Sequence, residues 1–503
     1  MSVYGLYPAS HFVVTSGRCA DCNSLPQALW YFRDETIAVP APGMPLAGFT
    51  PELSLAADLA AWRRQTAIGA DAAYPPLIWL GAPEVLRHAG LSADGSQLLG
   101  ADRARETRLA PRLPLNRSWF DASSLDFFQG KRLKLRGWHE DGAFVARTFW
   151  PEAFALPEQA PALALAAEPA ALRAWIRERP QGGAREPFSV ESVWRRPGSN
   201  GVQPGQPVLG LMLNGAQGDD DEAHSGHFAL MTGCVGEGGA IDDWLVNNFY
   251  SLDVESEKGI LAAPVPLDNY LGDLNSGQAW YRPSWLLVAT LRRPEAAIHL
   301  QAVFGRVYNQ FYRHQFSYQH ARANCTGISV TTARALGWQV PARGGESWLT
   351  AIFGLPLLAL RDRSLAKGKA MFDYLTEDRT RLYPAVAFAE AGADLLRLVR
   401  GESERDLSDF ERRLAEDIDE ILLVRVPQFP SSRAWGDSPA ENSVEYRARI
   451  PEDPAQRQII PVPPRPFPAE LRDPHSPKES PLRSDYAVAA WAIALIATLL
   501  LIL

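Results

Sequence analysis

Two short motifs, roughly a hundred residues apart, contain the side chains of a thiol nucleophile and its base. Cys325 lies in an Asn-Cys-Thr-Gly motif, and His227 lies in a Gly-His-Phe-Ala-Leu motif. A cysteine attacks an acyl carbon as the thiolate, and a neighbouring imidazole can take the thiol proton. The start of a helix also lowers the pKa of a thiol, because its unpaired N–H groups favour a negative charge. The motifs therefore predict nucleophilic catalysis by Cys325 with His227 as the base.

The imidazole of such a pair needs a third polar group that holds the ring in the tautomer that accepts the thiol proton. The segments 227–232 and 244–251 are predicted to be consecutive strands, which lie side by side if they form a hairpin. Asn247 on the second strand is then the expected orienting residue. Asn248 points to the opposite face of that strand and is the alternative.

The elements that must position these residues are predicted as strands followed by helices. Further strands are expected at 207–213, 285–291 and 316–320. A helix is expected to begin at Pro294, because proline suits the first turn of a helix. Another helix is expected from Cys325 to about Leu336, with Gly337 as its C-terminal cap. Cys325 would then point from the end of this helix.

The order and spacing of these motifs resemble the circularly permuted papain-like thiol hydrolases, in particular the lecithin:retinol acyltransferase-like proteins and bacterial cell-wall amidases. The resemblance covers residues 205–340. It implies that Cys325 is the nucleophile, that His227 is the general base and then the acid, and that Asn247 orients the ring. It also implies an oxyanion hole that includes the backbone N–H of Cys325. The chain departs from the family in a longer loop at 233–243, and in Asn247, where the family usually has histidine.

Composition divides the chain into five segments. These are a mixed α/β N-terminal domain at 1–185, the thiol hydrolase domain at 186–345, a helical extension at 346–426, a proline-rich linker at 427–485 and a tail anchor at 486–503. In the first segment we expect a hairpin within 131–150 and helices at 53–66 and 168–178. In the third we expect helices at 357–360, 385–399 and 410–424. Thirteen prolines between 427 and 481 favour an extended linker that cannot build a core.

The last residues are expected to anchor the chain in a membrane. Residues 486–503 carry no charged side chain, and 18 residues span roughly 27 Å as a helix, close to the hydrocarbon thickness of a bilayer. Lys478 and Arg483 precede them, which predicts a single-pass anchor with the bulk of the chain in the cytoplasm. A buried C-terminal helix is the alternative. The expected fold class is α+β: a permuted papain-like domain with an antiparallel sheet packed on helices, a mixed α/β N-terminal region, a helical C-terminal extension and a C-terminal transmembrane helix.

Length and composition limit the classes of function. A chain of 503 residues is expected to hold two or three domains. The net charge of −8 does not favour nucleic-acid binding, which usually needs a basic patch. Four cysteines are too few for a disulfide framework and suit a reducing compartment. The N-terminus lacks the basic start and apolar stretch of a signal peptide.

Two other groups could bind metal. Cys19 and Cys22, with His11, could form part of a zinc site, but a structural zinc site needs four ligands and no second pair follows. The acidic run 219–222 with His224 lacks the ligand spacing of a calcium loop and is expected to be a solvated loop. We therefore expect neither a metal nor a cofactor.

The other cysteine and histidines have simpler interpretations. Cys234 is expected to be a small buried apolar residue. His299, His314 and His320 lie near Cys325 in the sequence. Of these, His320 is the rival to His227 as the base, because it lies on the strand expected just before the cysteine motif.

The function expected from these features is a membrane-tethered hydrolase or acyltransferase that acts through a cysteine thioester on an amide or ester, possibly a lipid-linked one. The alternatives are a peptide or isopeptide amidase, and a catalytically inactive scaffold tethered to the membrane. The expected partners are the lipid bilayer, an acyl or peptide substrate, and a protein that binds the N-terminal domain or the proline-rich linker.

Overall fold

The structure is a computed structural model of the chain. It describes residues 2–69, 73–100, 104–116, 118–177, 187–216, 223–253, 259–276, 280–432, 434, 438–453 and 465–474. The expected membrane anchor at 486–503 and part of the proline-rich linker lie outside the described residues. Among the described residues, no helix has both the length and the apolar character needed to cross a bilayer.

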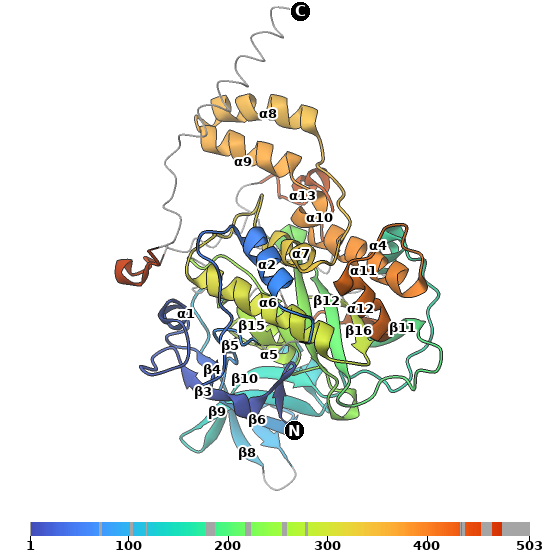
Figure 1. Cartoon of the computed structure of the whole chain (residues 1–503). Coiled ribbons are helices and arrows are strands. Elements are labelled where there is room, and N and C mark those ends of the chain that lie inside the picture. The colour runs from blue at the N-terminus through green and yellow to red at the C-terminus, as the bar shows by residue number, and fades with distance from the viewer. Residues whose placement is uncertain are drawn as a thin grey trace, which may run out of the picture.

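Five strands of the N-terminal half close into a small barrel at the bottom of Figure 1, in the order β10-β8-β7-β6-β9. They are β6 (Glu84–Leu91), β7 (Gln97–Leu99), β8 (Arg105–Leu109), β9 (Leu133–Glu140) and β10 (Ala143–Pro151). β9 and β10 confirm the hairpin expected within 131–150. Asp141 and Gly142 form its turn with φ of 49° and 82°, which Asp-Gly pairs accept readily.

A small three-stranded sheet, a two-stranded hairpin and four helices complete the N-terminal part. The strands are β1 (Val3–Tyr4), β2 (Tyr7–Pro8), β3 (Phe12–Ser16), β4 (Thr36–Pro40) and β5 (Ile78–Trp79). The helices are α1 (Pro26–Tyr31), α2 (Leu55–Gln65), α3 (Ala122–Phe128) and α4 (Pro169–Arg177). The helices expected at 53–66 and 168–178 are confirmed as α2 and α4.

The largest sheet has seven strands, each antiparallel to its neighbours, in the order β11-β17-β16-β12-β13-β14-β15. They are β11 (Ser189–Arg195), β12 (Pro207–Asn214), β13 (His227–Cys234), β14 (Leu245–Asn248), β15 (Ala263–Pro266), β16 (Ser284–Leu291) and β17 (Ile418–Val426). The strands expected at 207–213, 227–232, 244–251 and 285–291 are confirmed as β12, β13, β14 and β16. No strand forms at 316–320, where Gln319 makes only an isolated bridge to Ala323.

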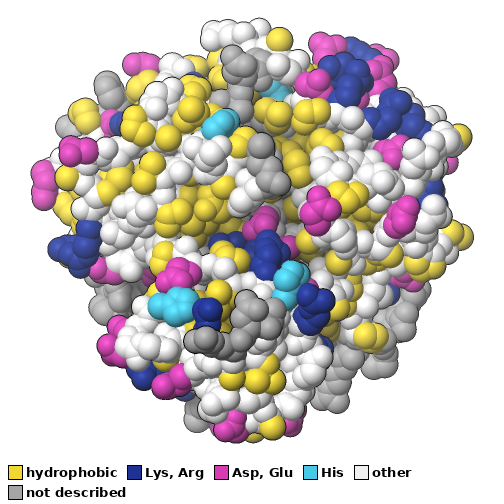
Figure 2. Space-filling view, turned by 90° about the horizontal axis from the view of Figure 1, so that it is seen from below, with side chains coloured by type: hydrophobic (Ala, Val, Ile, Leu, Met, Phe, Trp, Pro, Cys, Tyr) yellow, Lys and Arg dark blue, Asp and Glu magenta, His cyan; other side chains and the backbone are white. Residues whose placement is uncertain are grey.

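Helices pack against this sheet and extend beyond it. The helices are α5 (Leu267–Gly272), α6 (Glu295–Tyr312), α7 (Cys325–Leu336), α8 (Trp348–Arg361), α9 (Leu365–Thr376), α10 (Arg379–Leu382), α11 (Pro384–Arg400), α12 (Asp409–Asp417) and α13 (Ser443–Ala448). α6, α7 and α11 contact β13. α8 and α9 form a separate layer at the top of Figure 1, at the end of the molecule opposite the barrel. The barrel end, seen in Figure 2, mixes apolar side chains with charged side chains of both signs.

The fold class expected from the sequence is wrong. The described residues form a mixed α/β protein in which a closed barrel and a seven-stranded sheet share one hydrophobic core. The expected helix at 410–424 ends at Asp417, and the chain continues as β17. Because β17 lies between β11 and β16, the segment expected to be a helical extension supplies an interior strand of the sheet. The membrane helix of that fold class has no counterpart among the described residues.

Candidate active site

Cys325 is the first residue of α7, and its motif explains why the helix begins there. The side chain of Asn324 accepts a hydrogen bond from the N–H of Gly327 at 2.7 Å, which is the contact of a helix N-cap. The amide of Asn324 also donates to the carbonyl oxygen of Leu382 at 3.0 Å. Gly337 ends the helix with φ of 114°, as the sequence predicts. The motif therefore fixes the position of the cysteine at the start of α7.

His227 is the first residue of β13, and its backbone position is fixed by its neighbours. It pairs with Asn214 at the end of β12. Gly226 precedes it with φ of 73°, and a Cβ atom at this position would lie 2.3 Å from the carbonyl oxygen of Asn214. Only glycine fits both the positive φ and the close approach.

Cys325 and His227 line the same pocket, which has a volume of about 600 Å³. Its other walls come from distant parts of the chain, including α9 and α13. Among the lining residues are Tyr250, Arg282, Tyr318, His320, Leu358, Arg361, Lys367, Met371, Tyr374 and Tyr446. The pocket is large enough for an acyl group or a peptide side chain next to the thiol.

The Cys325 sulfur lies beside the start of β13. It lies 3.8 Å from the Thr326 hydroxyl, and the backbone of Phe228, the residue after His227, and the Tyr318 side chain also act to lower the thiol pKa. These contacts favour the thiolate, but burial outweighs them and raises the thiol pKa above its ordinary value of 9.0. Cys325 is only 5% exposed. The resting cysteine is therefore a protonated thiol at neutral pH.

The His227 ring is buried among aromatic and cationic side chains. Burial and the charge of Arg282 lower its pKa from 6.5 to about 3, against the opposing effect of Asn248. The ring stacks on Tyr250 with centroids 4.6 Å apart and an interplanar angle of 11°. Its Nε2 atom has no hydrogen-bond partner among the described residues. The imidazole is therefore neutral at neutral pH, and its lowered pKa makes it a weak base toward the thiol in this resting state.

The two asparagines of β14 have different surroundings. Asn247 forms a pair of amide hydrogen bonds with Gln301 of α6, at 3.0 and 3.1 Å, and donates to the carbonyl oxygen of Leu230. The structure thus places the expected orienting residue, Asn247, in a contact between the sheet and α6. Asn248, the alternative, is the asparagine whose side chain acts on His227 and raises the pKa of the ring.

The geometry of Asn248 suits an orienting residue. Its amide nitrogen donates to the carbonyl oxygen of Leu261 at 2.9 Å, which fixes the plane of the amide. Its Oδ1 atom makes no hydrogen bond of ordinary geometry with the described residues, so a small movement of the imidazole would complete the contact.

Several residues around the thiol were not expected from the sequence. Tyr250 follows β14 at the position opposite His227 if the register of β13 and β14 is continued, so the hairpin register could have identified it. Tyr270 of α5 donates to the side chain of Asn214 at 2.7 Å. Arg282 is buried, and it belongs to no sequence motif that contains His227 or Cys325. No pattern in the sequence indicates that it lies in this pocket.

The other histidines have different environments. His320, the rival base, also lines the pocket. His299 stacks on Trp62 at 4.7 Å, and burial lowers its pKa to about 4. His314 shares a 2.7 Å hydrogen bond with Tyr31. The last two pack within the fold and do not line the pocket.

The candidate zinc ligands Cys19 and Cys22 form a disulfide bond with each other. His11 bonds instead to the hydroxyl of Tyr74 at 2.8 Å. Burial raises the pKa of Cys234, which is partly buried. The acidic run 219–222 lies outside the described residues, while His224 is buried against Tyr446.

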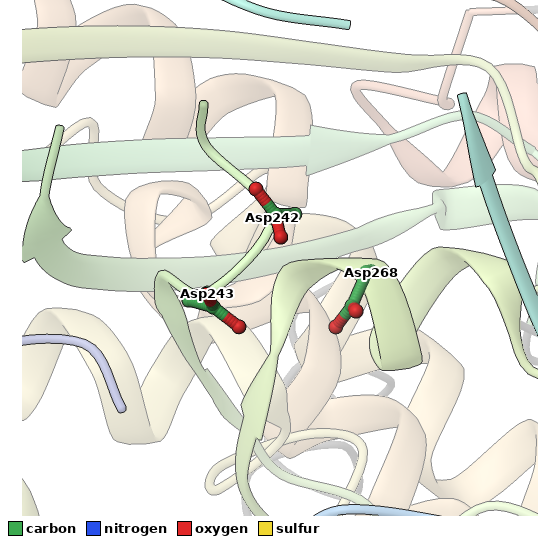
Figure 3. Close-up of side chains that lie close together, drawn as sticks. All are labelled: Asp242, Asp243 and Asp268. Carbon is green, nitrogen blue, oxygen red and sulfur yellow. The ribbon is translucent and has the colours of Figure 1, made fainter. Parts of the chain in front are cut away.

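Three aspartates converge elsewhere, at the junction of the sheet and the barrel. Asp242 and Asp243 precede β14, Asp268 lies on α5, and Figure 3 shows their carboxylates turned toward a common space. The ammonium group of Lys134 from β9 contacts all three carboxylates, lying 2.7 Å from Asp243 and 2.8 Å from Asp268. Arg136 adds a second contact to Asp268 at 2.8 Å. These cations occupy the space between the carboxylates, where a metal ion would bind. Because both cations come from β9 of the barrel, their ion pairs join the barrel to the sheet.

No protein-family model, no curated protein and no solved structure matches this chain. The resemblance to the permuted papain-like hydrolases is therefore neither supported nor opposed by a relative.

Proposed function

We propose that this chain is a cysteine-dependent hydrolase or acyltransferase that forms a thioester on Cys325. The observation that carries the proposal is the common pocket of Cys325 and His227, in which Nε2 of His227 has no hydrogen-bond partner among the described residues. A nucleophile and a neutral base at the ends of two packed elements is the arrangement that acyl transfer requires.

The residues suggest how the reaction would proceed. His227 takes the proton of the Cys325 thiol as the sulfur attacks the acyl carbon. The carbon–leaving-group bond then breaks, and the protonated imidazole returns its proton to the departing amine or alcohol. Water or another acceptor attacks the thioester in the second half of the cycle and restores the thiol. Asn248 orients the imidazole throughout.

Two features of the pocket suit the negative charge that develops on the acyl oxygen. The first-turn N–H groups of α7 point out of the helix end, and Asn324 caps only that of Gly327. Arg282 adds a positive charge on the pocket wall. Such donors stabilise a transition state most strongly where water is excluded.

The test uses an acyl-donating fluorescent ester and mass spectrometry of the intact chain. We expect an acyl adduct on the peptide that contains Cys325, and loss of both adduct and turnover in Cys325→Ala. Cys234→Ala is the matched control, because it removes the other free thiol and leaves turnover intact. His227→Gln should slow acylation by about 100-fold or more, the usual contribution of a general base.

An adduct that persists in Cys325→Ala would contradict the proposal. If no ester, thioester or amide in the panel is turned over and no adduct forms in the unaltered chain, the pocket belongs instead to an inactive scaffold.

A further inference from the structure

Helix α8 exposes a row of large apolar side chains. Trp348, Leu349, Phe353, Leu357 and Leu360 are between 55% and 79% exposed. The other large apolar side chains that are exposed among the described residues number at most two on any one element, at Val13, Val14, Leu53, Val85, Leu99 and Val444. A concentration of this kind on one element marks an interaction surface.

The spacing of these residues puts them on one face of α8. Leu349, Phe353, Leu357 and Leu360 recur at three- and four-residue intervals, which share a side of a helix. The other side is already occupied: Ala351 and Leu355 are buried. α9 approaches so closely that a Cβ atom at Gly368 would lie 2.4 Å from the carbonyl oxygen of Leu355. Among the described residues, the α8–α9 pair is therefore packed on its inner side and has no partner on its outer side.

The outer face of α8 is continuous with the candidate active site. Leu358 and Arg361 of α8 line the pocket of Cys325, and so do Lys367 and Met371 of α9. Leu357 lies one helical turn from Arg361, so the exposed row borders the pocket wall at that residue. A surface that contacts this face of α8 also lies beside the pocket.

Charge indicates the nature of that surface. Between residues 348 and 376 the chain has four basic and two acidic side chains, whereas the whole chain has a net charge of −8. Arg361 and Lys367 are exposed beside the apolar face, where they share the carboxylate of Asp362 at 2.7 and 3.7 Å and leave one net positive charge. Exposed leucines and an aromatic residue, flanked by arginine and lysine, are typical of helices that lie in the interface of an anionic bilayer.

We propose that α8 docks its outer face into the surface of an anionic lipid bilayer and holds the Cys325 pocket against it. Docking itself does not depend on catalysis.

The test measures the depth of a nitroxide label on the full chain reconstituted in vesicles of phosphatidylcholine and phosphatidylglycerol. The label is attached at Leu357→Cys in a chain that also carries Cys325→Ala and Cys234→Ala, so the readout is independent of catalysis. Val85→Cys on β6 of the barrel, where the native side chain is 43% exposed, is the matched control. We expect a ratio of oxygen to nickel-complex accessibility several-fold higher at 357 than at 85.

Three other results would count against the proposal. Equal ratios at the two positions would show that α8 faces water. Shielding of the label at 357 from both oxygen and the nickel complex would show that protein covers the face, either the 486–503 segment or a second copy of the chain. An unchanged ratio at 357 in vesicles of phosphatidylcholine alone would overturn the anionic part of the proposal.

Discussion

At the scale of residues, the candidate site is a neutral pair rather than an ion pair. Burial raises the pKa of the Cys325 thiol and lowers that of the His227 imidazole to about 3. Both shifts have the same origin, because a low dielectric disfavours the charged form of each group. Under the proposed function, the thiolate would form only during the reaction, as the proton passes to His227.

This state predicts an unusual pH dependence for alkylation of Cys325. With iodoacetamide, the rate at Cys325 should keep rising with pH beyond 9.0, because the thiol pKa lies above this ordinary value. His227→Gln should leave this profile unchanged, since the imidazole it replaces is uncharged above about pH 3. The rate is followed on the Cys325 peptide by mass spectrometry. A rate plateau in weak acid that disappears in His227→Gln would reveal a preformed ion pair and contradict the prediction.

The sequence indicates only those site residues that local structure also requires. Cys325 was identified because its Asn-Cys motif is also a helix start, and His227 because it begins a clear strand. Arg282 could not be found, because its place in the pocket depends on packing between segments far apart in the chain. The sequence could not show which of Asn247 and Asn248 faces the imidazole, because that depends on which side of β14 packs against His227. In the structure, the Asn247 side chain is hydrogen-bonded to Gln301 of α6.

At the scale of elements, the turn before β13 sets the position of His227, the proposed base. Gly226→Ala should destabilise the fold and reduce turnover, because the new methyl group would meet the carbonyl oxygen of Asn214 and displace His227. Gly130→Ala is the matched control: Gly130 has φ of 69°, close to the 73° of Gly226, but open space around its Cβ position. The first variant should lose about 1–3 kcal/mol more unfolding free energy than the second, measured by urea denaturation. Equal losses would show that the clash is relieved without cost.

β17 shows why the fold could not be predicted completely. The amphipathic pattern beginning at Asp409 is a real helix, but it ends at Asp417, and Ile418–Val426 is a strand buried along its whole length. A strand buried on both faces has no alternating pattern, so it cannot be distinguished from a continued helix by periodicity. Glu420 within it adds to the ambiguity, and only the structure shows its 2.7 Å ion pair with Arg195 of β11.

At the scale of the whole molecule, the Asp242–Asp243–Asp268 cluster connects the barrel to the sheet through Lys134. Lys134→Met should cost about 3–5 kcal/mol of unfolding free energy, because it leaves buried carboxylates without their shared cation. Arg18→Met is the control: the Arg18–Asp34 pair is exposed, and its loss should cost no more than about 1 kcal/mol. Similar losses in the two variants would mean that Arg136 and Arg87 compensate for Lys134.

The same cluster predicts that the unfolding free energy decreases at acid pH. Burial alone would raise the pKa of Asp242, but Lys134 and Arg87 lower it below 3.8. Its contribution is therefore present above pH 3.8 and is lost as the pH falls through the lowered folded-state pKa. Lys134→Met should make the fall in unfolding free energy below this pH shallower, which the same denaturation series measures.

The place of β17 also has a consequence for the order in which the chain can fold during its synthesis. β11 and β16 leave the ribosome long before β17, yet β17 is the strand that pairs with both of them. Until residue 426 emerges, β11 has no neighbour in the sheet and β16 presents an unpaired apolar edge. Such edges invite wrong pairing and aggregation, and late long-range pairing slows folding. The nascent chain should therefore need protection by chaperones over this interval, and its sheet should form only near the end of translation.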